Sequence, residues 1–277
     1  MRLLHSVPIS NQSTTFYLPV GQYGSLVVEY DVTTSQGNSM TRASAGNVIL
    51  NFNNKDVVNV DAEFLNLVGN LYGGVTKFVS NSGGANYMFT PIPLTSWSDS
   101  TNILDISEND KCYVKLDFSA LSAISASGSV NIYGKSKLGV MNYLHKITSR
   151  NIIVSGATTF TDSMLVNNVS QLYLKAPSNV SNIQILKDGE TIVDCSVELI
   201  NNYSDYVHQL ESTQSLIAID FAETKDLREV LGTQISYKYT FTNATTLNQY
   251  FSFLEFTQAK AIESKNKTLN KIQSKLS

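Results

Sequence analysis

The sequence predicts an all-β protein with a few short helices, arranged as two tandem domains of the same kind. Three observations carry this prediction: a strand pattern that occurs twice, a composition rich in uncharged polar residues with only 16% charged residues, and a length of 277 residues. Abundant Asn, Ser, Thr and Tyr with few charges are typical of turn-rich β surfaces rather than of helical bundles or disordered chains. The length suits two cores of the usual domain size, roughly 100 to 150 residues each.

The first copy of the pattern runs from about Phe16 to Gly134. Its centre has two β-branched runs, residues 47–52 and 55–60, on either side of Asn53 and Asn54. Such a pair tolerates positive φ, so we expect a hairpin there, followed by a short helix near residues 64–68. Further strands are expected at residues 112–118 and 129–133.

The second copy runs from about Thr159 to Phe256 and repeats this order. Residues 182–187 and 190–194 flank Asp188 and Gly189, another turn pair, and a helix-compatible stretch again follows, at residues 197–200. Residues 235–241 and 250–256 then match the two late strands of the first copy. A tandem pair of similar β domains is therefore predicted.

Basic charge is unevenly distributed along the chain. Residues 118–161 contain no Asp or Glu, and the segment from residue 257 onward contains a single acid, Glu263. If both copies fold alike, these two runs leave the molecule on the same side and give it a basic face. Such a face suits an anionic surface, either phospholipid headgroups or packaged nucleic acid, and a solvated linker with a frayed tail is the alternative. The basic residues of the two runs are Lys135, Lys137, Lys146, Arg150, Lys260, Lys265, Lys267, Lys271 and Lys275.

These features divide the chain into four parts. Residues 1–134 form the first domain, 135–158 a basic helical linker, 159–256 the second domain, and 257–277 a basic C-terminal tail. The linker is expected to be helical because its apolar residues at 140, 141, 144 and 147 would line one helix face. The tail has a weakly amphipathic pattern, which suits a fraying helix as well as contact with a membrane or partner.

Cys112 and Cys195 fall at different places in the two copies, so they do not form a repeated disulfide. Two buried thiols in a reducing cytoplasm are the simpler expectation. The first residues lack the apolar core of about 7 to 15 residues that a signal peptide needs, and no run reaches the roughly 18 apolar residues of a membrane span. We therefore expect a protein that is neither exported by that route nor membrane-spanning.

Residues with catalytic potential are scattered. The spacing of His5, His145 and His208 does not suggest a shared metal, and no nucleophile elbow, phosphate loop or dinucleotide fingerprint occurs. Trp97 suits a sugar platform, but loop packing explains one tryptophan equally well. We predict no enzyme, no catalytic residues, no cofactor-binding residues and no metal ligands.

Two clusters of acids come closest to a functional motif. They occupy corresponding positions ahead of matching strands, so a turn and helix cap belonging to the architecture is the preferred interpretation. A structural calcium ion held by such clusters is kept as the alternative. The clusters are Asp105, Glu108 and Asp110 in the first copy, and Glu223, Asp226 and Glu229 in the second.

Three local patterns carry a resemblance to a known family: residues 18–22, residues 182–189 with the following helix, and residues 250–256. With them, the chain from Phe16 to Phe256 resembles the double jelly-roll major capsid proteins of icosahedral, membrane-containing phages. The corticovirus type and the small finnlakevirus coat are the most similar. The resemblance implies two tandem eight-stranded jelly-roll β-sandwiches with short helices.

The function implied by this resemblance is self-assembly. Subunits of that family form pseudo-hexagonal homotrimers, which build an icosahedral virion shell over an internal lipid membrane. The expected partners are the chain itself, minor capsid and vertex proteins, and an anionic lipid membrane, without sequence-specific nucleic acid. The basic residues given above would face the membrane or the particle interior, and the protein would be found in the virion capsid, and in the host cytoplasm before assembly.

The competing interpretation is a phage receptor-binding or carbohydrate-binding β-sandwich protein. An acid-free basic run and a basic tail are features for which such an adhesin has no evident need. Its binding loops would also be expected to carry more aromatic side chains than this chain offers. The capsid interpretation is therefore preferred.

Overall fold

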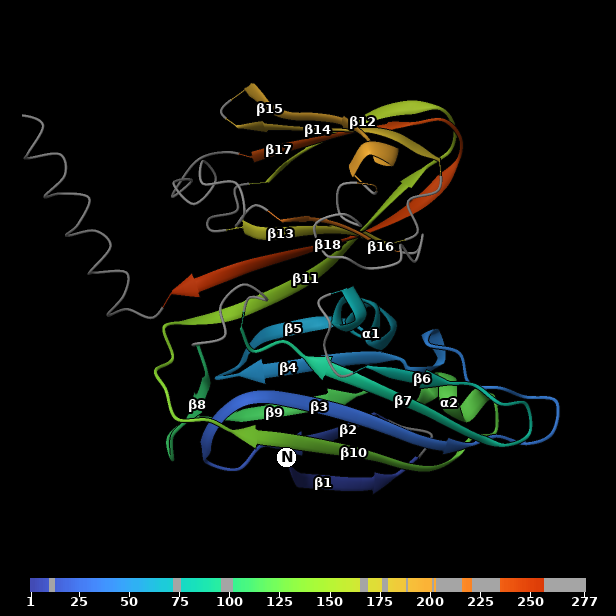
Figure 1. Cartoon of the computed structure of the whole chain (residues 1–277), viewed down its shortest axis with the longest axis vertical. Coiled ribbons are helices and arrows are strands. Elements are labelled where there is room, and N and C mark those ends of the chain that lie inside the picture. Colours follow the sequence, from blue (N-terminus) through green and yellow to red (C-terminus); the bar gives the residue numbers. More distant parts are fainter. Residues whose placement is uncertain are drawn as a thin grey trace, which may run out of the picture.

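The computed structural model describes residues 1–9, 13–71, 76–95, 102–164, 169–175, 179–187, 189–200, 202, 216–220 and 235–256. Within these residues the chain forms three β-sheets of six, eight and four strands (Figure 1). The second half of the chain lies above the first half along the long axis of the molecule. Among the residues described, no helix has the length and apolar character needed to cross a membrane.

The first half of the chain forms a two-sheet sandwich. One sheet has the order β1-β10-β3-β7-β6, with β8 also paired to β3, and the other contributes β5-β4-β9-β2 to the eight-stranded sheet. The strands are β1 (Arg2–Pro8), β2 (Thr14–Tyr17), β3 (Gly21–Thr33), β4 (Asn47–Phe52), β5 (Lys55–Asp61), β6 (Lys77–Val79), β7 (Ala85–Ile92), β8 (Leu104–Ile106), β9 (Cys112–Leu116) and β10 (Ser127–Ser136). The helices are α1 (Ala62–Leu71), α2 (Ser119–Ala123) and the short 3-10 helix η1 (Ala43–Ala45).

The second half forms a similar sandwich. Its sheets have the orders β16-β13-β18-β11 and β12-β17-β14-β15. The strands are β11 (Tyr143–Val154), β12 (Thr158–Met164), β13 (Val169–Lys175), β14 (Val180–Lys187), β15 (Glu190–Ser196), β16 (Leu216–Asp220), β17 (Ile235–Phe241) and β18 (Thr245–Phe256). Residues 197–200, directly after β15, are helical.

The predicted repeat is confirmed at the level of strand order. The order β7-β3-β10-β1 recurs as β16-β13-β18-β11, and β2-β9-β4-β5 recurs as β12-β17-β14-β15. Both halves are therefore jelly rolls, each a pair of antiparallel four-stranded sheets. In the described residues the second roll has β11 to β18, whereas the first adds β6 and β8 and so exceeds the eight strands that we expected.

Both predicted hairpins are present. Asn53 and Asn54 have φ of 51° and 64°, and Phe52 pairs with Lys55 across them. In the second roll Lys187 pairs with Glu190, and Gly189 has a φ of 88°, whereas Asp188 lies outside the described residues. Positive φ at these positions fits the right-handed twist of the flanking strands, which is why Asn and Gly occupy them.

The helical linker predicted at residues 135–158 is wrong. β10 continues to Ser136, and Tyr143–Val154 form strand β11, which pairs with β18 along its whole length. Tyr143, His145 and Ile147 are buried while their neighbours are more exposed, so the period is two residues. Pairing with β18, a strand far along the chain, overrides the weak helical spacing that we had used.

The two rolls share one sheet. β11 of the second roll runs parallel to β5 of the first, with Ile147 beside Val58 and Thr148 beside Asn59. The hydrophobic core of the first roll also continues into the second roll through Ile147, Tyr173, Leu216, Ala218 and Tyr250. A separate core, which includes Leu172, Tyr239 and Phe251, fills the second roll.

Candidate functional site

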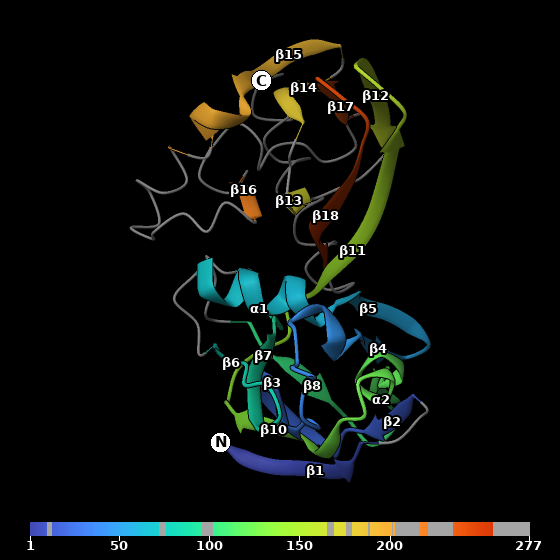
Figure 2. The same cartoon turned by 90° about the vertical axis from the view of Figure 1, so that its right-hand side faces the viewer.

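The contact between the rolls, which we call the joint, is formed by α1 against the outward face of β13 and β18 (Figure 2). The ring of Phe64 on α1 stacks on Tyr250 with 3.7 Å between centroids and an angle of 8°. It also meets Tyr173 edge-on at 5.4 Å. All three rings are buried, and each such aromatic pair adds roughly 0.5 to 1.5 kcal/mol beyond the burial of area.

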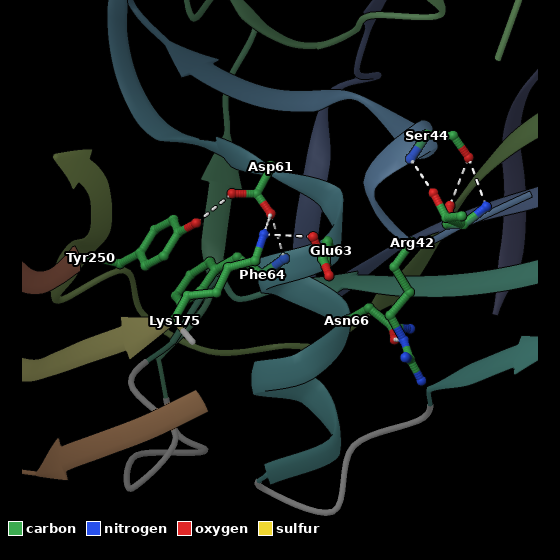
Figure 3. A network of polar contacts seen from close by, with 9 residues as sticks. Arg42, Ser44, Asp61, Glu63, Phe64, Asn66, Lys175 and Tyr250 are labelled. Atoms are coloured by element: carbon green, nitrogen blue, oxygen red, sulfur yellow. Dashed lines mark hydrogen bonds and ion pairs between the residues drawn. The ribbon is translucent and has the colours of Figure 1, made fainter. Parts of the chain in front are cut away.

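Polar contacts surround this aromatic centre (Figure 3). Lys175 Nζ lies 3.2 Å from Asp61 Oδ1 and 2.5 Å from Glu63 Oε2. The hydroxyl of Tyr250 donates to Asp61 Oδ2 at 2.5 Å, and Asp61 also accepts the backbone N–H of Phe64 at 2.8 Å. Burial lowers the pKa of Lys175, but the hydrogen bond to Glu63 and the nearby Asp61 outweigh it, so the pKa is raised.

The same contact continues along β11 and β18. Glu255 on β18 accepts from Lys55 of the first roll at 3.0 Å and forms an ion pair with Lys146 of β11. The pKa of Glu255 is lowered, above all by its hydrogen bond to Lys146. His145 is buried beside it, with Nε2 2.5 Å from Ser252 Oγ, and burial lowers the pKa of His145 to about 4. Of these contacts, Lys55–Glu255 joins the two rolls, whereas Lys146–Glu255 and His145–Ser252 lie within the second roll.

A second feature is the outward face of the first sheet, which we call the outer flank. It consists of the outward-pointing side chains of strands β1, β10, β3, β7 and β6. At its centre Glu29 accepts hydrogen bonds from Tyr133 at 2.7 Å, from Asn131 at 2.8 Å and from Tyr87. Burial acts to raise the pKa of Glu29, but these donors outweigh it and the pKa is lowered. Its larger apolar and aromatic members are Leu3, Val27, Val79, Tyr87, Phe89 and Tyr133.

A third feature is the exit end, where β10 stops, β11 starts and β18 stops (Figure 1). Phe256, the last residue of β18, pairs with Tyr143, the first of β11. Lys135 is exposed there, and Leu138 is 92% exposed in the chain between the rolls. Both chain exits therefore lie at one end, as the repeat predicted.

The predicted basic residues do not all belong to an open basic face. Lys146 pairs with Glu255 and Arg150 pairs with Asp162. The fold also brings an acid to the exit end, since Gln22 pairs with Asp105 while its carbonyl accepts the N–H of Lys137 at 3.1 Å. The five lysines of the tail, Lys260, Lys265, Lys267, Lys271 and Lys275, lie outside the described residues.

The first acidic cluster belongs to a turn. Asp110 accepts from the N–H of Ser107 at 2.8 Å and from Asn53 at 2.7 Å, whereas Asp105 accepts from Gln22 at 3.1 Å. In the part of the chain that the structure describes, no group of three His, Cys, Asp or Glu is placed to hold a metal ion. The calcium alternative stays untested. Trp97, His208, Glu223, Asp226 and Glu229 lie outside the described residues.

The two cysteines are free, and they lie on strands β9 and β15 of different rolls. Cys112 is buried, and burial raises the pKa of its thiol to about 12. Cys195 is only half-buried, which differs from the buried thiol that we expected.

Comparison with known proteins finds one family model and several solved structures that are similar to this chain. Residues 141–255, which cover nearly all of the second roll, match the family model "Viral coat protein P2 C-terminal domain". The fold is similar to the crystal structure of the major capsid protein P2 from bacteriophage PM2, with a TM-score of 0.66 and 12% identity over 92% of this chain and 98% of that chain. A further similar structure is that of the Sputnik virophage, at a TM-score of 0.46 and 9% identity over 91% of this chain and 85% of that one. No curated protein sequence matches.

These findings confirm the resemblance on which the sequence was interpreted. The second roll matches the coat-protein family by sequence, and the whole chain has the double jelly-roll fold of the P2 protein. The joint and the outer flank were missed by sequence reasoning, because Tyr, Glu and Lys on strands carry no motif before their partners are known.

Proposed function

From a second roll that matches a viral coat-protein domain and a fold shared with the P2 capsid protein, we propose that this chain is a major capsid protein. It assembles with itself as pseudo-hexagonal trimers that tile an icosahedral virion shell over an internal lipid membrane. The observation that carries the proposal is the pair of jelly rolls with equal strand order, fused side by side through one sheet.

Two similar rolls in one subunit explain the pseudo-hexagonal shape of the trimer. Three copies related by a threefold axis contain six rolls, so the trimer has a sixfold outline with true threefold symmetry. The joint already holds two of these six rolls with a buried aromatic stack and an ion-pair network. The role is structural, and subunit faces rather than a reaction centre perform it.

The exit end gives the shell its polarity. Lys135, Lys137 and the exposed Leu138 lie where both rolls end, and the lysine-rich tail starts from the same place. Cationic and apolar side chains together favour contact with an anionic bilayer surface. The exit end therefore faces the lipid vesicle inside the particle. Minor capsid and vertex proteins complete the shell around these trimers. Before assembly, the protein is in the host cytoplasm.

Native mass spectrometry of the purified chain tests the assembly. We expect a trimer whose population rises with protein concentration, and electron microscopy of assembled particles should show pseudo-hexagonal tiles. A protein that stays monomeric at every concentration would contradict the tile. Glycan binding by such a monomer would instead favour the receptor-binding alternative.

A further inference from the structure

The two rolls are linked by a short and exposed connection. β10 ends at Ser136 and β11 begins at Tyr143, so residues 137–142 lead from one roll to the other. In this stretch Leu138 is 92% exposed and Val140 is 67% exposed. Packing of these two side chains therefore does not fix the direction in which β11 leaves the first roll.

One asparagine of the first roll holds the start of β11. Asn102 is fully buried, and its Oδ1 accepts the N–H of Asn142 at 2.8 Å and the N–H of Tyr143 at 3.3 Å. Its Nδ2 donates to the carbonyl oxygen of Tyr143 at 3.0 Å and to that of Leu94, in the first roll, at 3.3 Å. A single side chain thus binds backbone groups of both rolls.

The amide of Asn102 matches these four backbone groups in number and kind. A primary amide has two N–H donors and an oxygen that can accept two hydrogen bonds, and Asn102 uses all of them. A carboxylate would face two carbonyl oxygens without a proton to donate, and a hydroxyl has one donor for two acceptors. The contact therefore has a strict geometry as well as a strict chemistry.

Asn102 fastens the second roll far from the joint. Tyr143 pairs with Phe256 on β18, whereas Tyr250, which stacks on Phe64 in the joint, lies six residues earlier on the same strand. Six residues of strand span about 20 Å. Two contacts separated in this way fix an angle between the rolls, whereas the joint alone would allow a pivot.

The other contacts between the rolls near Asn102 are less directional. The ion pair of Lys55 with Glu255 is largely exposed, and such pairs contribute little. Met141 and Leu144 are only partly buried against the core of the first roll, and apolar contacts have no preferred direction. β11 and β5 share only two residue pairs.

We propose that Asn102 sets the angle between the two rolls and thereby decides whether three copies close into a trimer. The proposal rests on the proposed function, because closure concerns only a chain that assembles in this way. A cyclic trimer closes when each subunit presents its contact faces at the rotation that the threefold axis requires. A subunit whose rolls pivot has this rotation for a fraction of the time, and its apparent affinity falls by the same fraction.

Asn86 offers a matched control. Its side chain is also fully buried and makes four hydrogen bonds, all within the first roll, to the N–H groups of Met40 and Asn81, to Thr34 Oγ1 and to the carbonyl oxygen of Gly84. Asn86→Ala and Asn102→Ala therefore remove equal numbers of buried hydrogen bonds, but only Asn102→Ala removes a contact between the rolls.

Distances between two spin labels measure the angle between the rolls. The labels are attached through Tyr17→Cys in the first roll and Ile153→Cys in the second, both at exposed positions, after alanine has replaced the two native cysteines. An excess of unlabelled chain restricts the signal to distances within one copy. By double electron–electron resonance we expect a narrow distance distribution for the wild type and Asn86→Ala, and a broad or shifted one for Asn102→Ala.

Native mass spectrometry of the unlabelled variants measures assembly. If about one molecule in ten keeps the required angle, the apparent affinity between copies of Asn102→Ala falls about tenfold, whereas Asn86→Ala keeps that of the wild type. Circular dichroism checks that both variants are folded. Should either alanine variant not fold, serine, which retains one donor and one acceptor, takes the place of alanine at both positions.

The possible outcomes separate this inference from the proposed function. An unchanged distance distribution for Asn102→Ala, or the same broadening in Asn86→Ala, would overturn the inference. Trimers of unchanged affinity from a broadened Asn102→Ala would also overturn it, because the angle would then not control closure. A wild type that is monomeric at every concentration would refute the trimer, while the label distances would still decide whether Asn102 sets the angle.

Discussion

Asp61 joins local and long-range structure through one carboxylate. It ends β5, accepts the N–H of Phe64 at the start of α1, and binds Lys175 and Tyr250 of the second roll. Sequence reasoning places a helix after this hairpin, because an apolar, helix-compatible stretch follows it directly in the chain. It could not find the joint, since the partners of Asp61 lie 114 and 189 residues away.

Lys175→Met should destabilise the protein more than loss of an exposed ion pair. It leaves the carboxylates of Asp61 and Glu63 without their cation in a half-buried site, and we expect the free energy of unfolding to fall by roughly 1 to 3 kcal/mol. Arg150→Met is the control, because Arg150 pairs with Asp162 at a position that is 44% exposed. That variant should lose less than about 1 kcal/mol in urea unfolding. Equal losses would show that the joint contributes nothing special.

His145 should make the protein less stable in acid. The folded protein keeps the imidazole neutral down to a pKa of about 4, whereas the unfolded chain protonates it near 6.5. Its contribution is therefore complete above pH 6.5 and is lost as the pH falls toward 4, by about 3 kcal/mol in all. Urea unfolding between pH 7 and 5 should show a shallower pH dependence for His145→Gln than for the wild type. Parallel curves would contradict this assignment.

At the scale of elements, the hairpins were predictable and the connection between the rolls was not. Asn53 with Asn54, and Gly189, mark turns through their own backbone preferences, so neighbouring residues suffice. β11 was mistaken for a helix because its apolar residues fit both periods, and its partner β18 decides between them. The strands β6 and β8 of the first roll were likewise missed, since each spans only three residues.

Gly46 should be required where the chain enters β4. Its φ of 72° and ψ of −159° are open to glycine alone, and a Cβ there would lie 2.2 Å from the carbonyl oxygen of Asp117. We expect Gly46→Ala to lower the free energy of unfolding by about 2 kcal/mol or more. Gly156→Ala, where a Cβ meets nothing within 4 Å, is the control and should change it by less than about 0.5 kcal/mol. A loss of the same size in both would contradict a special role for Gly46.

At the scale of the whole molecule, the two basic exits were placed correctly relative to each other because the rolls repeat. The charge of these exits was not predicted correctly, because Asp105, Asp162 and Glu255 come close to the basic residues only through strand pairing. A run that lacks acids in sequence therefore gains them in space. Of the described residues, Lys135 stays basic at the exit end. In the orientation that we propose, the five lysines of the tail supply most of the attraction to lipid.

Deleting the residues after Gln258 tests that attribution. The variant should keep its fold and its thermal unfolding, and should bind anionic liposomes more weakly at low ionic strength, because five lysines are removed. Added salt near 1 M should abolish the difference, since it shortens the screening length to about 3 Å. Neutral liposomes serve as the control. Unchanged binding to anionic liposomes would contradict the proposed orientation of the shell.

Each roll is closed by its first and last strands, since β1 pairs with β10 and β11 pairs with β18. During synthesis the first roll can therefore close as soon as residue 136 has left the ribosome, while β11 must wait for a strand that ends at Phe256. The completed first roll then offers the edge of β5 as a template for the late half. Vectorial synthesis thus makes the amino-terminal half the scaffold on which the carboxy-terminal half is built.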